Sequence, residues 1–279
     1  MRRLLVHPSA LEADGTRLRV MPRPADGRGV GLELLDLVDG QRAERAPVDA
    51  PACVVVLSGY CDVSSEHGAW RGLGDRPDPF SGRPWAACLP PGTRFEVVGW
   101  AGGTQVAICT GFGGVGMEPR VLEPAAIAAE VRGHGPRHHR VHPILTGEAA
   151  AGGLLVRELV TPAGHWSGWA SHGHDDGAPP DGLPLAGACH HRVARRGGHG
   201  LQRVRAHDRT LDETVVFRDG DVVLAPHGRH TVSAPPGHAV SSLLVRLGGR
   251  RQRTQTVSVT RHAVHHVAVS RHGETHSIT

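Results

Sequence analysis

The chain is poor in aromatic residues and in cysteine. Phenylalanine, tryptophan and tyrosine together make up 4% of its 279 residues, and Tyr60 is the single tyrosine. The five cysteines are scattered along the sequence, odd in number and never spaced as CxxC. This usage argues against a disulfide framework and against a zinc ribbon. We therefore expect a protein of the reducing cytoplasm.

Long apolar runs and strong charge are also missing. No stretch of 18 apolar residues is present, so we expect no membrane span. The first residues, MRRLLVHPSALEADG, lack the sustained apolar segment of a secretory signal. The net charge is only +4, and no basic patch is interleaved with aromatic residues. Nucleic acid is therefore not an expected partner, whereas a small molecule is. The sequence leaves the oligomeric state open.

Glycine and proline are abundant, at 38 and 21 residues, and they are spaced throughout. This spacing favours many short strands over long helices. The stretch 52–65 reads as two strands around a Ser-Gly turn, and two more strands flank the Gly-Gly pair at 102–103. Further strands are predicted within 152–162 and 239–248. The Asp-Gly pair within 213–226 separates two β-branched runs, which predicts a hairpin.

One helix is predicted, over 122–131, where Pro124 precedes an alanine-rich run. It lies between two strand-rich halves that share a pattern of turn, strand and Pro-x-Gly. We therefore expect two related β-barrels. The predicted divisions are an N-terminal barrel at 1–120, a connector at 121–139, a C-terminal barrel at 140–250 and a poorly ordered, His- and Arg-rich tail at 251–279.

Metal-binding residues are predicted in the stretch WASHGHDDGAPP. On a strand, His172 and His174 would face the same side, and His230 follows a turn later in the chain. Two early histidines and a late one at the mouth of a barrel are typical of a cupin-type metal site. Imidazole ligands suit Zn, Mn, Fe or Ni. An HxH pair also arises easily by chance, because the chain contains 21 histidines.

The stretches LLVRELVTPAGHWSGWASHGHDD and LDETVVFRDGDVVLAPHGRH give the sequence a resemblance to a known family. It resembles the 5-deoxy-glucuronate isomerases, the IolB family, over roughly residues 20–250. The resemblance implies an all-β bicupin fold with a short connecting helix and a metal site in the C-terminal barrel. It also implies the conversion of 5-deoxy-D-glucuronate, a sugar acid, to 5-dehydro-2-deoxy-D-gluconate in myo-inositol catabolism.

The family's metal ligands are two histidines, a glutamate and a later histidine. The histidines correspond by motif to His172, His174 and His230, but the glutamate position falls on Gly187. No glutamate occurs between Glu158 and Glu213. Three imidazoles can hold a metal on their own. The missing ligand could also be replaced by His191, which shares the strand parity of Gly187, or by Asp175 or Asp176. Alternatively, the metal site has decayed.

The chemistry of an aldose–ketose isomerase suggests further site residues. A base must move a proton between adjacent carbons, and a cation should hold the substrate carboxylate. Candidates for the cation are Arg157, Arg192 and Arg203. Arg203 alternates with Gln202, so one of the two must face inward. Two more candidates are Glu213, which could instead be a turn residue, and His165, which could instead have a packing role.

The sequence thus predicts a metal-dependent isomerase with a bicupin fold. The alternative is a non-catalytic cupin that binds a sugar acid or a protein partner. A third possibility is a locally corrupted reading frame, which would also account for the tail. The metal content of the purified protein would distinguish the first two.

Overall fold

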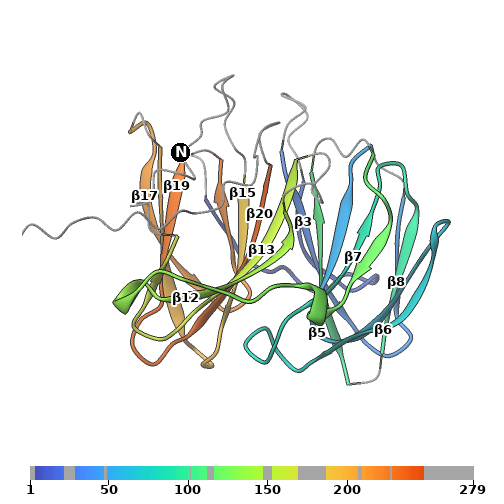
Figure 1. The fold of residues 1–279 in the computed structure, drawn as a ribbon, viewed down its shortest axis with the longest axis horizontal. Helices are drawn as coiled ribbons and strands as arrows, with labels where there is room; N and C mark the ends of the chain where they lie inside the picture. The colour runs from blue at the N-terminus through green and yellow to red at the C-terminus, as the bar shows by residue number, and fades with distance from the viewer. Residues whose placement is uncertain are drawn as a thin grey trace, which may run out of the picture.

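The computed structural model describes residues 4–21, 29–46, 49–100, 102–111, 116–146, 153–168, 187–206, 209–226 and 228–247. The described residues form two β-barrels that lie side by side (Figure 1), and short 3-10 turns are their helical elements. The predicted all-β architecture of two barrels is therefore confirmed. Within the described part of the chain, no helix is long and apolar enough to cross a membrane.

The N-terminal barrel is a network of nine strands. Strand β5 is its centre, since it pairs with β6, β7, β8 and β9. The strands are β2 (Thr16–Val20), β3 (Gly31–Leu37), β4 (Arg42–Arg45), β5 (Ala52–Ser65), β6 (Gly68–Arg76), β7 (Trp85–Leu89), β8 (Phe95–Gly99), β9 (Thr104–Thr110) and β10 (Arg120–Leu122).

The C-terminal barrel consists of a seven-stranded and a four-stranded sheet. The larger sheet contains β1 (Leu5–Val6), β18 (Val222–Ala225), β15 (Gly187–Val193), β20 (Val240–Leu247), β13 (Leu154–Thr161), β12 (His139–Leu145) and β11 (Glu130–Arg132), in this spatial order. The smaller sheet contains β14 (Trp166–Ser167), β19 (Arg229–Ser233), β16 (His199–Arg205) and β17 (Asp212–Arg218).

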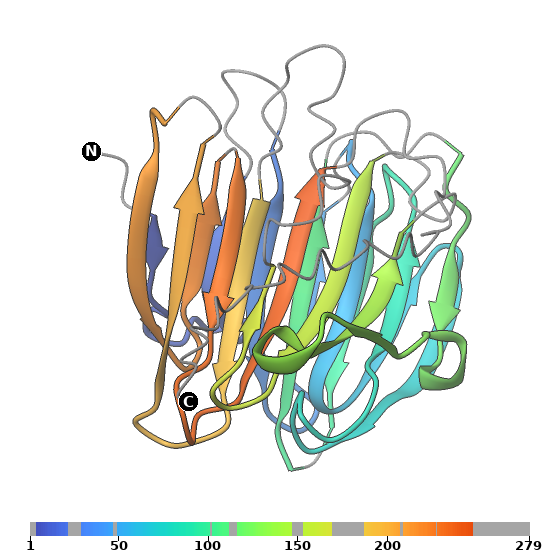
Figure 2. The same ribbon diagram turned by 60° about the vertical axis from the view of Figure 1, so that its left-hand side comes forward.

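The first strand belongs to the C-terminal barrel. Strand β1 pairs antiparallel with β18, and Figure 2 shows it as a dark-blue strand among orange ones. Next to it, His7 Nδ1 lies 2.8 Å from Asp221 Oδ1. The N-terminal residues thus complete the far barrel, whereas the sequence predicts an N-terminal domain that begins at residue 1.

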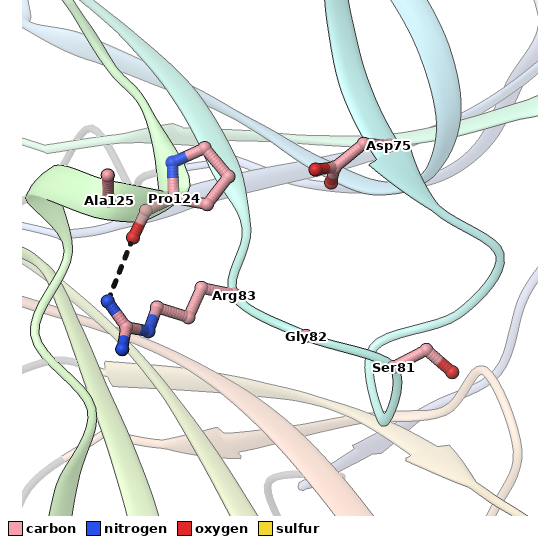
Figure 3. Close-up of a pocket in the computed structure, with 6 residues that line it drawn as sticks. All are labelled: Asp75, Ser81, Gly82, Arg83, Pro124 and Ala125. Carbon is pink, nitrogen blue, oxygen red and sulfur yellow. Dashed lines mark hydrogen bonds between the residues drawn. The ribbon is translucent and has the colours of Figure 1, made fainter.

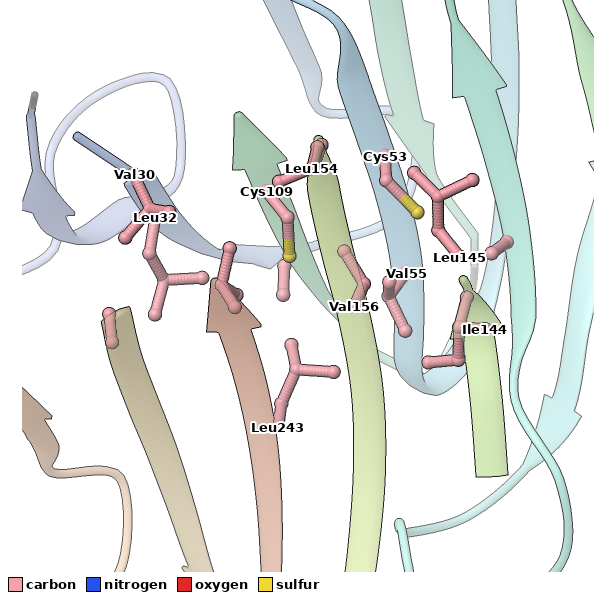
Figure 4. Close-up of a cluster of buried hydrophobic side chains, with 14 of the residues drawn as sticks. Val30, Leu32, Cys53, Val55, Cys109, Ile144, Leu145, Leu154, Val156 and Leu243 are labelled. Atoms are coloured by element: carbon pink, nitrogen blue, oxygen red, sulfur yellow. The ribbon is translucent and has the colours of Figure 1, made fainter. Parts of the chain in front are cut away.

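The two barrels pack against each other through the outer faces of their large sheets. Leu32, Val55 and Cys109 from one barrel meet Leu154, Val156 and Leu243 from the other (Figure 4), all buried. These contacts form one hydrophobic cluster between the sheets, so the barrels share a core. Burying such side chains stabilises the folded state by roughly 1.5–3 kcal/mol each.

A buried ion pair also bridges the barrels. Arg76, at the end of β6, donates to both carboxylate oxygens of Glu158 in β13, at 2.9 and 2.7 Å. His142 Nδ1 lies 3.0 Å from Glu158 Oε1. The side chains of Arg76 and Glu158 are at most 1% exposed. Arg76 and His142 lower the pKa of Glu158 against the opposing effect of burial.

Two predicted turns differ in the structure. The stretch 52–65 is one strand, β5, and Gly59 within it is a bulge with φ of 75°. A Cβ at Gly59 would lie 2.3 Å from the carbonyl oxygen of Gly103, so only glycine fits this close approach. Strands β8 and β9 flank the Gly-Gly pair as predicted, but each pairs with β5.

The predicted hairpin over 213–226 is wrong. A turn does form, in which the Arg218 amide donates to Asp221 Oδ2 at 2.7 Å. However, β17 pairs with β16, whereas β18 pairs with β1 and β15. The turn therefore carries the chain from one sheet of the barrel to the other. A local turn signal does not specify which strands pair.

The predicted helix over 122–131 is reduced to one 3-10 turn, Pro124–Ala126, and a second turn, Gly135–Arg137, follows. Arg83 donates to the carbonyl oxygens of Pro124 and Ile127, and Ile127 is buried in the inter-barrel cluster. A helix this short is marginal by itself, so these tertiary contacts decide the conformation.

Three of the five cysteines are neighbours in space. Cys53 is the register partner of both Cys88 and Cys109, and its Sγ lies 3.7 Å from that of Cys88. All five are buried free thiols. Residues that are scattered in the sequence thus form one row across three strands.

Candidate active site in the C-terminal barrel

The interiors of the two barrels differ in polarity. The N-terminal barrel is filled by a buried hydrophobic cluster that includes Leu35, Val54, Phe95 and Ile108. The described side chains of this cluster are apolar, and Trp85 packs against it. The C-terminal barrel instead buries histidine, glutamine and serine side chains. The candidate site is therefore in the C-terminal barrel.

His191 is at the centre of this polar interior. Its Nδ1 lies 2.9 Å from Ser242 Oγ, and its Nε2 lies 2.6 Å from Gln202 Oε1. Its ring stacks on Phe217 with centroids 3.8 Å apart. Burial lowers the pKa of His191 to about 3, although its contact with Gln202 opposes this. His191 is thus a neutral residue with both ring nitrogens engaged, and this argues against the predicted role of His191 as a substitute metal ligand.

His230, at the start of β19, faces the same interior. Its Nε2 lies 3.8 Å from Cys189 Sγ, and Gln202 Nε2 donates to the same sulfur at 3.6 Å. Burial raises the pKa of the Cys189 thiol to about 12. His230, Cys189 and Gln202 thus come from three strands and meet between the two sheets.

His172, His174, Asp175 and Asp176 lie outside the described residues, as does the tail from residue 251. Among the described residues, no three His, Cys, Asp or Glu side chains are grouped as a metal site. The described chain stops at Gly168, where an added Cβ would lie 2.7 Å from the carbonyl oxygen of His230. It resumes at Gly187 on the inner wall of the same barrel.

Gly187 has the inward orientation that the sequence predicts. It alternates with Cys189 and His191 along β15. A Cβ at Gly187 would lie 3.3 Å from Arg246 Cγ and 3.3 Å from the carbonyl oxygen of Val245. Arg246 is its register partner on β20. The Arg246 side chain therefore passes beside the position at which the family resemblance implies a carboxylate ligand.

Two predicted catalytic candidates share the inner face. Arg157 is the register partner of Leu244, which is itself opposite Cys189. Glu213 is opposite Val204, and Val204 is opposite His230 on its other side. Two strand spacings, about 10 Å, separate the backbones of Glu213 and His230. Glu213 is thus a carboxylate on the same inner wall as His230.

Three other candidates lie elsewhere. Arg203 is on the outer face of β16, where it pairs with both carboxylate oxygens of Asp212 at 2.7 Å. Gln202 is the inward member of that pair, so a role for Arg203 in the barrel is not supported. Arg192 donates to Asp219 at 2.8 Å and to Gln105 of the other barrel.

His165 is separated from His230 by the length of β19. The carbonyl of His165 accepts from the Ala234 amide just beyond the last residue of β19, whereas His230 is near its first. The His165 ring lies 2.9 Å from the carbonyl of Ala163 and makes an edge contact with His138. The packing role is therefore the one that these contacts support.

An open hollow of about 360 Å³ lies outside this barrel. It is lined by Asp75, Ser81, Gly82, Arg83, Pro124 and Ala125 (Figure 3). Arg83 is held there by the carbonyl oxygen of Pro124. None of these lining residues belongs to the C-terminal barrel. They also do not combine an acid, a base and a set of metal ligands in one place.

Sequence and structure comparisons agree with this architecture. The model of the KduI/IolB family matches residues 4–265. A 5-deoxy-glucuronate isomerase of Geobacillus thermodenitrificans is 34% identical over 239 residues, which cover 85% of this chain and 87% of the relative. One from Bacillus subtilis subsp. natto is 27% identical over 256 residues, which cover 90% and 94%.

Solved structures show the same fold. An IolB-like protein from Salmonella typhimurium LT2 superposes with a TM-score of 0.78 at 28% identity, covering 88% of this chain and 93% of that one. An oxalate decarboxylase superposes with a TM-score of 0.55 at 12% identity, covering 91% and 79%, which supports the fold alone. With a family match over almost the whole described chain and relatives above 30% identity, the chain belongs to the KduI/IolB family.

Proposed function

We propose that this protein is a 5-deoxy-glucuronate isomerase, which interconverts the aldose 5-deoxy-D-glucuronate and the ketose 5-dehydro-2-deoxy-D-gluconate. We place it in the cytoplasm, in inositol catabolism. The names of its relatives support the activity. The observation that carries the proposal is the polar interior of the C-terminal barrel, where His230, Cys189 and Gln202 meet.

We further propose one divalent metal ion, held by His172, His174 and His230. The described donors suit such an ion, because His230 Nε2 faces the interior beside a sulfur atom, and imidazole binds Zn, Mn, Fe and Ni. When bound, the ion would act as a Lewis acid on the sugar's carbonyl and hydroxyl oxygens. His191 serves the site by fixing the amide of Gln202.

Isomerisation also requires a proton to move between the first two carbons of the sugar. We assign this step to Glu213, a described carboxylate on the inner wall that contains His230. A carboxylate takes the proton from C2 of the aldose and returns it to C1, while the proton of the C2 hydroxyl passes to the C1 oxygen, so that the aldehyde becomes an alcohol and C2 becomes the ketone. The neighbouring wall residues Val204 and Val215 are apolar.

A non-catalytic sugar-acid-binding cupin remains the second candidate. The observation that favours it is the register pair Gly187 and Arg246, because it puts the side chain of a cationic residue beside the position of the expected carboxylate ligand. A nearby positive charge weakens the binding of a cation. The two candidates make opposite predictions about turnover.

The test is to incubate purified protein with 5-deoxy-D-glucuronate and follow the aldehyde carbon by NMR, with the metal content measured on the same sample. The proposal expects conversion to the ketose, about one divalent ion per chain, and loss of conversion after chelation. A folded, metal-loaded protein that leaves the aldose unchanged would favour the binding protein instead. Conversion without any bound metal would refute the metal assignment.

A further inference from the structure

Arg246 is an inward-facing cation at the mouth of the C-terminal barrel. It alternates along β20 with Leu244 and Ser242, and Ser242 contacts His191 inside the barrel. Its Cγ would lie 3.3 Å from a Cβ added at Gly187, which puts its side chain on the same inner face. Its charge also favours the Cys189 thiolate on that face, against burial. The strand alternation and the position of Cγ therefore orient this side chain inward.

The described structure offers Arg246 no anionic partner. Arg203 and Arg192 each pair with an aspartate, whereas no hydrogen bond or ion pair joins Arg246 to any residue of the described ranges. Arg246 is also partly buried. A guanidinium that has lost part of its water is stabilised when an anion replaces that water.

The shape of the group indicates which anion. A guanidinium presents parallel N–H donors that match the two oxygens of a carboxylate. Gly187, the register partner of Arg246, has no side chain and so puts no group of its own between Arg246 and the barrel interior. His230 and Cys189 lie deeper on the adjoining walls. A sugar acid could therefore place its carboxylate at Arg246 and its other end towards His230.

We propose that Arg246 binds the carboxylate of the sugar-acid ligand and thereby selects uronates over neutral sugars. The identity of the sugar acid rests on the proposed function, but the contact itself requires no turnover. On this proposal Arg246, rather than Arg203, determines the preference for uronates over neutral sugars.

The test compares binding of D-glucuronate with that of D-glucuronamide, whose amide replaces the carboxylate with a neutral group of the same shape. Titration calorimetry is done on wild type, Arg246→Met and Arg246→Lys, with and without a chelator. Arg203→Met is the control, because it removes an arginine from the outer face. Circular dichroism and thermal unfolding confirm that each variant is folded.

The wild type should bind glucuronate at least about tenfold more tightly than glucuronamide, as a charge-assisted contact implies. Arg246→Met should lose this preference, Arg246→Lys should keep part of it, and Arg203→Met should keep all of it. The proposal is overturned if wild type shows no preference, if Arg246→Met retains it, or if chelation alone removes it. A preference that follows Arg246 in a protein without isomerase activity would reject the proposed function and leave this contact standing.

Discussion

Acidification from pH 7 to pH 5 should destabilise the fold through two adjacent histidines. Burial lowers the pKa values of His190 and His191 to about 3, compared with 6.5 for an exposed histidine. Below pH 6.5 the unfolded chain therefore binds protons at these two histidines, whereas the folded chain leaves both of them neutral. The stabilisation is present in full above pH 6.5 and is lost as the pH falls towards 3.

The size of this effect follows from proton linkage. Between pH 7 and pH 5, each histidine removes about 2 kcal/mol from the free energy of unfolding, provided its folded pKa lies below about 4.5. Together they remove about 4 kcal/mol, a large part of a typical 5–15 kcal/mol. Glu158 does not contribute between pH 7 and pH 5. Its pKa is lowered in the folded protein, so the stability it provides is lost only as the pH falls below its ordinary pKa of 4.5.

Urea unfolding at pH 7 and pH 5 measures this difference in the free energy of unfolding. One substitution separates the contribution of His190 from that of His191. His190 is opposite Val222 and Leu243, and its Nε2 is buried without a hydrogen-bond partner among the described residues. His190→Leu should therefore fold well and show about half the pH dependence. The exposed His199 provides the control, His199→Leu, which should keep the full dependence. A wild-type loss below about 1 kcal/mol would refute the reasoning, because these histidines would then protonate within the fold.

Three other predictions concern the barrel interface, the missing ligand and the tail. Glu158→Gln should cost about 3–5 kcal/mol in urea unfolding by leaving the buried Arg76 uncompensated, and the double variant with methionine at both positions should recover most of it. Gly187→Glu should tighten metal binding more in an Arg246→Met background than alone, since Arg246 otherwise pairs with the new carboxylate; equal affinities in calorimetry would contradict this. Truncation after residue 250 should shift the thermal midpoint by only a few degrees, and an insoluble product would show that the tail completes the fold.

The strand content could be predicted from the sequence, but the pairing of strands could not. Strands β13 and β20 follow from their apolar, β-branched stretches at 152–162 and 239–248. The hairpin over 213–226 fails because a turn signal is local, whereas pairing depends on the whole barrel. The helix over 122–131 fails because Arg83 and the buried Ile127 outweigh a weak local propensity.

The candidate site was also predictable only where it depends on the alternation of residues within one strand. The alternation of β15 correctly places Gly187 and His191 on one inner face. The inward choice between Gln202 and Arg203 requires the register of β16, which the sequence does not contain. Arg246 was missed because its importance comes from lying opposite Gly187, 59 positions away in the sequence. Cys189 gains its contact with His230 only when the two sheets close.

We propose that the C-terminal barrel catalyses the isomerisation with the help of His230. The most direct measurement is kcat/KM for 5-deoxy-D-glucuronate in His230→Ala, beside a control, His238→Ala, at a partly exposed position beyond the far end of β19. We expect His230→Ala to lose at least about a hundredfold, because losing a metal ligand would remove the Lewis acid from the sugar oxygens, while His238→Ala should match wild type. Wild-type activity in a folded His230→Ala protein would show that His230 takes no part in the reaction.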